Sequence, residues 1–183
     1  MDQNKNASHL TAIGEIGLDF WYKWVKKDKG KKDEQIAVFQ RFVGLAKELN
    51  LPIIIHSRGA WRECLDIVKE SGIKKANFHW YSGPVDILSE IIACGYYVSA
   101  SPSLAYSPQS REAISQAPIE HVLLETDCPV FYRSSERDDQ GFRAEPKDVL
   151  RTLKAYCELK NIDEDQASEI FFRNAKEFFD IKS

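Results

Sequence analysis

Short apolar runs alternate with longer amphipathic stretches along this chain of 183 residues. Apolar and β-branched residues concentrated over a few positions are typical of buried strands. Five such runs predict five strands, at residues 10–16, 52–55, 76–79, 96–99 and 121–125.

The first long amphipathic stretch precedes the second predicted strand. Apolar residues recur there at steps of three and four, which predicts a helix with one apolar face that ends at Asn50. The residues of this pattern are Phe39, Phe42, Val43, Ala46 and Leu49. Residues 23–32, just before it, are mostly charged and predict a solvated loop.

The later amphipathic stretches predict five more helices. In the fourth of them we expect Leu150, Leu153 and Tyr156 on the inner face. The predicted helices cover residues 60–70, 84–95, 108–116, 146–159 and 163–179.

Strict alternation of strand and helix predicts a parallel sheet covered by helices. Two architectures follow this order. An open doubly wound sheet of five strands fits the length, whereas a complete eight-stranded α/β barrel takes about 250 residues. In either case we expect a single domain over residues 1–183.

Composition narrows the classes of function. The formal charge of −3 argues against a broad phosphate-binding surface but leaves room for a local nucleic-acid site. The apolar runs are too short to cross a membrane, and residues 1–6 are polar, without the apolar core of an export signal. The four cysteines show no C-x-x-C spacing, so reduced thiols and a cytoplasmic location are expected.

Chemistry-bearing residues stand where four of the predicted strands end. Glu15, His56, His79 and Asp127 occupy these positions. The carboxyl ends of parallel strands meet at one edge of a sheet, so we expect the four side chains to converge. Imidazole nitrogens and carboxylate oxygens bind zinc, manganese and related divalent ions. Each residue alone is more simply a packing or capping residue, whereas the joint pattern favours a metal site. The remaining histidines, His9 and His121, precede strands and are interpreted as surface residues.

These strand ends also carry a resemblance to the TatD-type deoxyribonucleases. The similarity runs in order from about residue 11 to the C-terminus. It rests on G-E-I-G-L-D at 14–19, P-I-I-I-H-S-R at 52–58, H-W-Y-S-G at 79–83, L-L-E-T-D-C-P at 123–129, R-A-E-P at 143–146 and N-A at 174–175.

The resemblance implies a metal-dependent hydrolase on a (β/α)8 barrel that cleaves phosphodiester bonds of DNA, often from the 3′ end, with Mg, Mn or Zn. It implies that Glu15 bridges two metals, that His56 and His79 bind the second, and that Asp127 binds the first and accepts the proton of the attacking water. Arg58 and Arg143 are then candidates to neutralise the phosphate, although a surface ion pair explains either arginine equally well. Ser82 lies beside a predicted helix start, which offers an anion site.

The family also begins with a strand carrying H-x-H, and no H-x-H occurs in this chain. We therefore expect an incomplete barrel of about five C-terminal β/α units, with one metal bound where the family binds two. The strands at residues 10–16 and near Val122 are then expected to have unpaired edges, which favour self-association.

Three other functions stay open. A catalytically impaired partial barrel could bind a metal or a partner without turnover. A related barrel could hydrolyse amides or lactones with similar ligands, although Arg58 and the G-E-I-G-L-D string favour phosphate. An open α/β domain with incidental histidines requires four coincidences at strand ends.

Overall fold

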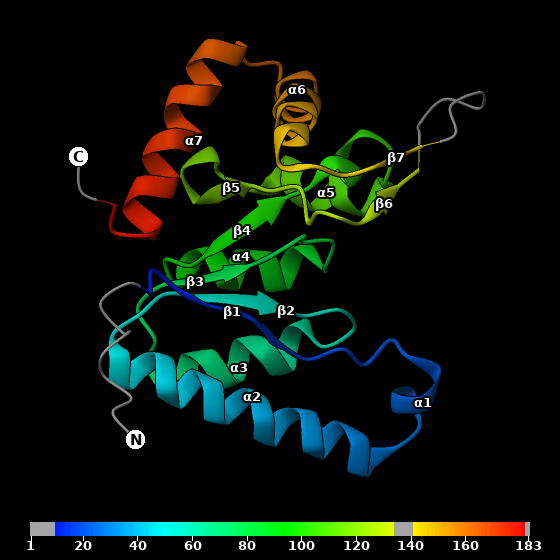
Figure 1. Cartoon of the computed structure of the whole chain (residues 1–183), viewed down its shortest axis with the longest axis vertical. Helices are drawn as coiled ribbons and strands as arrows, with labels where there is room; N and C mark the ends of the chain where they lie inside the picture. The colour runs from blue at the N-terminus through cyan, green and yellow to red at the C-terminus, as the bar shows by residue number, and fades with distance from the viewer. Residues whose placement is uncertain (1–9, 134–140, 182–183) are drawn as a thin grey trace.

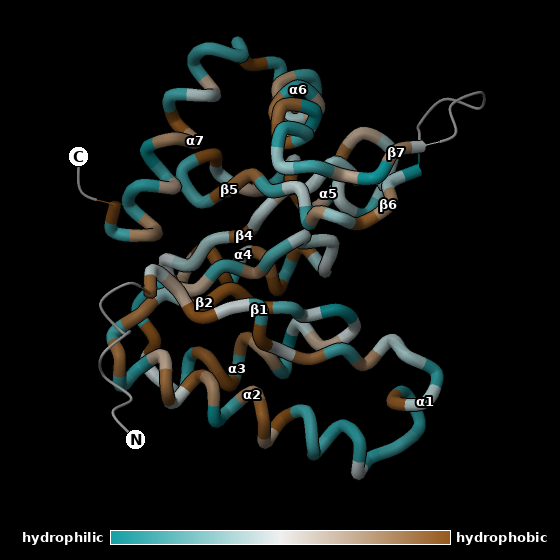
Figure 2. The backbone as a smooth tube through the Cα atoms, in the orientation of Figure 1, coloured by the Kyte–Doolittle hydropathy of each residue, from teal (hydrophilic) through white to brown (hydrophobic). Residues whose placement is uncertain are grey.

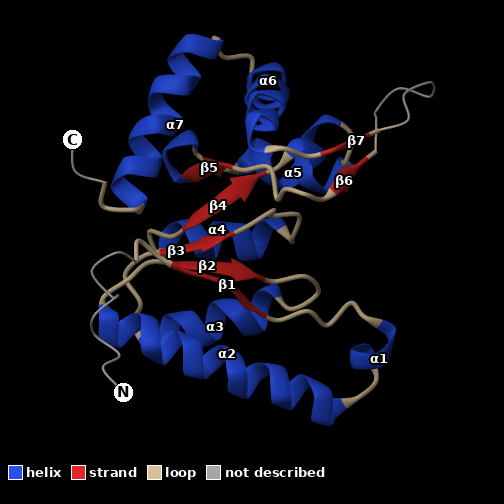
Figure 3. Ribbon diagram, viewed as in Figure 1, coloured by secondary structure: helices blue, strands red, loops and turns tan. Residues whose placement is uncertain are grey.

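The computed structural model describes residues 10–133 and 141–181. In these ranges, five parallel strands form one sheet in the order β1-β2-β3-β4-β5 (Figures 1 and 3). Their bounds are β1 (Ile13–Gly17), β2 (Ile53–His56), β3 (Ala76–Phe78), β4 (Tyr97–Ala100) and β5 (Val122–Leu124). All five predicted strands are therefore confirmed, with ends that differ from the predicted ones by up to three residues.

Helices connect successive strands and cover the sheet. The α-helices are α1 (Lys23–Lys26), α2 (Lys29–Leu49), α3 (Trp61–Ser71), α4 (Val85–Ala93), α5 (Pro108–Gln116), α6 (Val149–Lys160) and α7 (Glu164–Phe178). Short 3-10 helices are η2 (Pro102–Ala105), η3 (Ile119–His121) and η4 (Pro146–Asp148). From α2 onward, each α-helix contacts the next one in chain order. A parallel sheet whose helices pack side by side in sequence has the geometry of a β/α barrel wall.

The two faces of the sheet pack against different neighbours. Ile53, Ile55, Phe78 and Val98 belong to the main core and are fully buried. Figure 2 shows the apolar run of β2 at the centre of the structure. Strand residues that alternate with these core positions, such as Ile54 and Ser99, line a groove that α6 and α7 border. Strands β1 and β5 lie at the two edges of this sheet, as the incomplete barrel predicts.

The loop predicted at residues 23–32 is wrong. Helix α1 and the first turn of α2 occupy this segment. Val25 is fully buried and anchors α1, while the Asp28 side chain accepts a hydrogen bond from the Lys31 backbone N–H at 3.1 Å and caps α2. Lysine is a good helix former, so a charged segment becomes helical once one apolar residue and one cap hold it.

The polar loop after the fifth strand contains a hairpin that the pattern did not predict. Strands β6 (Phe131–Tyr132) and β7 (Phe142–Arg143) pair antiparallel. Two-residue strands are too short for an alternation pattern, which is why no signal for them is visible along the chain.

Three predicted burial states also differ in the structure. Phe42 is 42% exposed and Leu150 is 66% exposed, because α2 and α6 each bury a narrower stripe than the periodicity indicated. His121 is half-buried rather than a surface residue, and its Nδ1 lies 3.0 Å from the carbonyl oxygen of Tyr96. His9 lies outside the described residues. Among the described helices, none combines the length and the apolar composition of a membrane span.

Candidate metal centre

Three of the four predicted site residues converge at the carboxyl edge of the sheet. Glu15 lies within β1, His56 is the last residue of β2, and His79 follows β3 directly. The strands are parallel, and Gly17 pairs with His56 while Ile55 pairs with Phe78. This register brings side chains that are up to 64 positions apart in sequence to one point.

The ligand-type atoms of these residues face one another. Glu15 Oε1 lies 2.7 Å from His56 Nδ1 and 2.8 Å from His79 Nε2. The two imidazole nitrogens are 3.3 Å apart. Ligand atoms bonded to one transition metal at about 2.0–2.2 Å lie at comparable separations from each other, so this trio fits a divalent cation. The described part of the chain thus has a candidate metal site of one carboxylate and two imidazoles.

Two further carboxylates contact the ring nitrogens of His56 and His79 that face away from Glu15. His56 Nε2 lies 2.9 Å from Asp19 Oδ2, and His79 Nδ1 lies 3.3 Å from Glu125 Oε2. An ionised carboxylate only accepts hydrogen bonds, so each of these ring nitrogens donates its N–H. The opposite nitrogen of each ring therefore faces Glu15, and it can bind a cation once it has lost its proton.

Glu125 is itself fixed by the backbone. Its Oε1 accepts a hydrogen bond from the Trp80 N–H at 2.6 Å, and Trp80 has a positive φ of 43°. A bulky residue rarely adopts this conformation, and such positions concentrate at functional sites. The backbone N–H of Trp80 therefore fixes the Glu125 carboxylate in the position from which it contacts His79.

The charges of the site shift the protonation of its members. Hydrogen bonds from His56 and His79 hold the pKa of Glu15 far below its usual range. Burial lowers the pKa of His79, but its hydrogen bonds to Glu125 and Glu15 outweigh burial and raise the pKa to about 10. The pKa of His56 is also raised, because its bonds to Glu15 and Asp19 outweigh burial. In the metal-free chain, protons therefore hold the place that a cation would take.

Asp127, the fourth predicted residue, lies in the same cleft without joining the trio. The cleft has a volume of about 410 Å³, and its walls include His56, His79 and Asp127. Burial raises the pKa of Asp127, with the nearby charges of Glu125 and Glu15 adding to the effect and His79 opposing it. Asp127 has a positive φ of 45°, which aspartate tolerates better than most residues.

Two of the three predicted phosphate-binding residues lie at the cleft. Arg58 and Ser82 line the cleft. Arg58 is bound through Nε and Nη2 to Asp19 Oδ2, at 2.9 and 2.7 Å. Arg143 is exposed on β7 and is not among the described residues that line the cleft.

Sequence reasoning missed Asp19 and Glu125 as parts of the site. A signal was present for both, because Asp19 ends the G-E-I-G-L-D string and Glu125 stands two residues before Asp127. Neither could be told from a helix cap or surface acid without the contacts to His56 and His79.

Comparison with known proteins agrees with this geometry. A family model described as TatD related DNase matches residues 1–180. The chain belongs to the TatD related DNase family. It is 34% identical to the metal-dependent hydrolase YabD of Bacillus subtilis over 94% of this chain, and 32% identical to deoxyribonuclease TATDN3 of Homo sapiens over 93% of it.

The chain of this TatD family member spans only part of those relatives, 66% of YabD and 60% of TATDN3. Among solved structures, it is similar to the TatD homologue YJJV of Escherichia coli, with a TM-score of 0.80 and 24% identity over 93% of this chain and 64% of that one. A TatD family hydrolase of Entamoeba histolytica gives a TM-score of 0.78 at 22% identity, covering 96% of this chain and 65% of that one. At this level of identity the likeness concerns the fold, and it confirms the incomplete barrel.

Proposed function

We propose that this TatD family chain carries a metal-dependent phosphodiesterase centre that acts on DNA. The observation that carries the proposal is the meeting of Glu15, His56 and His79 within hydrogen-bond distance at the rim of the sheet. Family membership supports the reaction class, and the name of the human relative supports DNA as the substrate.

Each residue of the site has a role in this proposal. Glu15, His56 and His79 hold a divalent cation, and Asp127 completes the ligand set from the wall of the cleft. The cation supplies Lewis-acid chemistry when bound, lowering the pKa of a coordinated water and offsetting phosphate charge. Imidazole nitrogen suits Zn and related ions, and carboxylate oxygen suits Mg and Mn, so we propose one of these three metals.

The remaining chemistry comes from side chains of the cleft. Asp127 is the proton acceptor, because it is a carboxylate that lines the cleft with His56 and His79 without belonging to the trio. Arg58 presents a guanidinium that can pair with a phosphate, and Ser82 adds a hydroxyl nearby. Arg143 is exposed on β7 and is not among the described residues that line the cleft, so we assign it contacts with a longer substrate.

A cleavage assay tests this function. Single-stranded DNA labelled at its 5′ or 3′ end is incubated with Mn²⁺, Mg²⁺ or Zn²⁺, or with EDTA. We expect metal-dependent cleavage that Glu15→Gln and His79→Asn each reduce at least 100-fold. His121→Gln is the matched control, because this histidine contacts Tyr96 and lies outside the cleft. Early release of the 3′ label as a mononucleotide indicates cleavage that starts at the 3′ end. Early appearance of fragments of intermediate length from both labels indicates internal cleavage.

Two results would contradict the proposal in different ways. Cleavage that is equal in the wild type and in Glu15→Gln would show a contaminating nuclease. Metal binding that His79→Asn abolishes, without any cleavage by the wild type, would leave a metal-binding protein and not an enzyme.

The proposal extends to self-association through the sheet edges. Strands β1 and β5 each have one neighbour in the five-stranded sheet, and open edges are templates for pairing. Sedimentation velocity tests this: we expect a dimer or larger species at micromolar concentration, and a monomer at all concentrations would contradict it.

A further inference from the structure

Three large aromatic residues lie exposed beside the metal centre. Trp21, Tyr22 and Trp24 are 62%, 48% and 63% exposed. They precede or belong to α1, which lies beyond the carboxyl end of β1 (Figure 1). Three exposed rings in four positions are more than scattered surface hydrophobicity accounts for, and such clusters mark binding surfaces. We call these three residues the aromatic platform.

The rings are held in place and are linked to the site. Tyr22 and Trp24 stack with ring centroids 5.7 Å apart and planes 24° apart. The Arg58 guanidinium lies 4.9 Å from the Tyr22 ring centre, and Tyr22 itself lines the metal cleft. Asp19, which holds His56 through Oδ2, accepts the Trp21 N–H through Oδ1 at 3.0 Å. One carboxylate therefore positions both a candidate ligand and the start of the platform.

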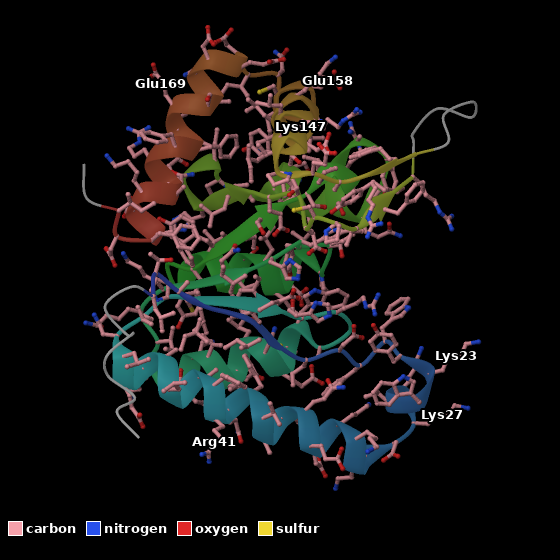
Figure 4. The ribbon with its side chains drawn as sticks, in the orientation of Figure 1. Lys23, Lys27, Arg41, Lys147, Glu158 and Glu169 are labelled. Atoms are coloured by element: carbon pink, nitrogen blue, oxygen red, sulfur yellow. The ribbon has the colours of Figure 1, made fainter. Side chains whose placement is uncertain are left out.

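Positive charge surrounds the platform. Residues 21–32 contain six lysines and one acidic residue, a net charge of +5 in a chain whose total is −3. The Lys26 ammonium lies 5.7 Å from the Trp21 ring centre, and Lys31 pairs with Glu34 at 3.0 Å. Figure 4 shows Lys23 and Lys27 pointing away from α1. The segment beside the cleft is therefore positively charged, whereas the chain as a whole is negatively charged.

We propose that the aromatic platform stacks the bases of a single-stranded nucleic acid, while the neighbouring lysines follow its phosphates toward the cleft. The inference rests on the proposed function and names the surface that holds its substrate. Aromatic rings interleaved with lysines are the combination by which proteins bind unpaired strands, because every base has a face that can stack. Bases in a duplex are already stacked, so this surface favours single strands over double strands.

Binding is tested without cleavage. Fluorescence anisotropy follows a 5′-labelled 15-residue oligo-dT in EDTA, which removes the metal on which the proposed reaction depends. Stacking contributes about 1–3 kcal/mol per base, or about 5- to 160-fold, so we expect Trp21→Ala/Trp24→Ala to weaken binding at least about 5-fold. The matched control is Phe172→Ala, which removes a 68% exposed ring that lies 5.5 Å from the Lys176 ammonium on α7. The control is expected to stay within twofold of the wild type, and thermal unfolding verifies that both variants fold.

Two further arms separate stacking from charge. An abasic oligonucleotide of equal length keeps the phosphates, so we expect wild-type binding to it to be weaker and to be unaffected by the double tryptophan variant. Lys23→Gln/Lys27→Gln should weaken both oligonucleotides and reduce the salt dependence, by about 0.7 in the log–log slope for each phosphate that the variant no longer neutralises.

Each contrary outcome overturns the inference. Equal binding by wild type and Trp21→Ala/Trp24→Ala would show that the aromatic platform does not stack bases. Absence of oligo-dT binding by the wild type would show that this surface does not bind single strands. A change in sedimentation of the double variant, without a change in DNA binding, would assign the rings to a protein contact. This inference and the proposed function fail separately: a wild type that binds oligo-dT through the platform in EDTA, but cleaves nothing with any metal, contradicts only the proposed function.

Discussion

Asp19 is expected to control cation binding without being a ligand. Its carboxylate has 14% of its surface exposed, and its Oδ2 lies 2.9 Å from His56 Nε2. This contact holds the proton on Nε2 and leaves Nδ1 for the cation. In Asp19→Asn the amide presents one of two groups to His56. Its oxygen still accepts the Nε2 proton but has no negative charge, whereas its NH2 group can only donate to Nε2. The second arrangement forces the proton onto Nδ1, the nitrogen that faces Glu15.

The size of the effect follows from the hydrogen bond that the substitution removes. A hydrogen bond to a charged group contributes about 1.5–3 kcal/mol, and removing a partner that orients a ligand typically costs 10- to 100-fold in metal affinity. Both ranges include a loss of about 30-fold, or about 2 kcal/mol. Asp19 also raises the pKa of His56, so its removal relieves proton competition. The loss in affinity is therefore expected to be larger at pH 8 than at pH 6.

Titration calorimetry with Mn²⁺ or Zn²⁺ measures the affinity directly, and urea unfolding measures it by linkage. At a free metal concentration of 100 times the wild-type Kd, the wild type gains about 2.7 kcal/mol of stability, whereas a variant that binds 30-fold more weakly gains about 0.9 kcal/mol. Asp66→Asn is the matched control, because Asp66 is an exposed aspartate of α3 outside the cleft. Arg58→Gln keeps the Asp19–His56 contact and should change the Kd less than threefold.

One pattern of results would refute this reasoning. If Asp19→Asn binds the cation within twofold of wild type at both pH values, while His56→Asn loses binding, then His56 needs no orientation by Asp19.

Three other predictions concern protons and packing. Metal binding at pH 7 should release about one proton from His79, whose pKa is raised to about 10, and the apparent affinity should rise about tenfold per pH unit from pH 7 toward 9; calorimetry in buffers of different ionisation enthalpy that finds no proton release would contradict this. Asn174→Ala should lower the unfolding free energy by about 2 kcal/mol in urea, because its buried side chain donates to two backbone carbonyls at 2.7 and 2.9 Å, and a loss under about 0.5 kcal/mol would show that water replaces these bonds. Gly17→Ala should cost more than about 3 kcal/mol, since Gly17 has a φ of +148° and an added Cβ would lie 1.9 Å from the His56 carbonyl oxygen, whereas Gly44→Ala in α2 meets nothing within 4 Å and should be neutral or stabilising.

Much of the fold could be predicted because its signals are local. Each strand is a short apolar run, and helices such as α5 begin at caps that the sequence shows: the Ser107 side chain accepts the Ser110 N–H, as expected for serine before proline. The placement of Glu15 within one apolar run, and of His56 and His79 at the ends of two others, is also local, and parallel pairing brings these runs together.

Other features depended on partners far away in the chain. Helix α1 exists because Val25 finds a place in the core, and the exposure of Leu150 depends on which side of α6 the sheet and α7 leave open. Periodicity shows that one face of a helix is apolar, but it does not show how much of that face a neighbouring element covers.

The sequence by itself determined the order of strands and helices, the residue types at the strand ends and the family strings that contain them. Only the tertiary structure decided that Asp19 and Glu125 orient the two histidines, that Asp127 lies beside the trio, and that Arg143 is exposed on β7. The reason is that a residue's type and spacing follow from the local chain, whereas a distance of 2.9 Å between side chains 37 positions apart depends on the register of two strands and on the loop that follows them.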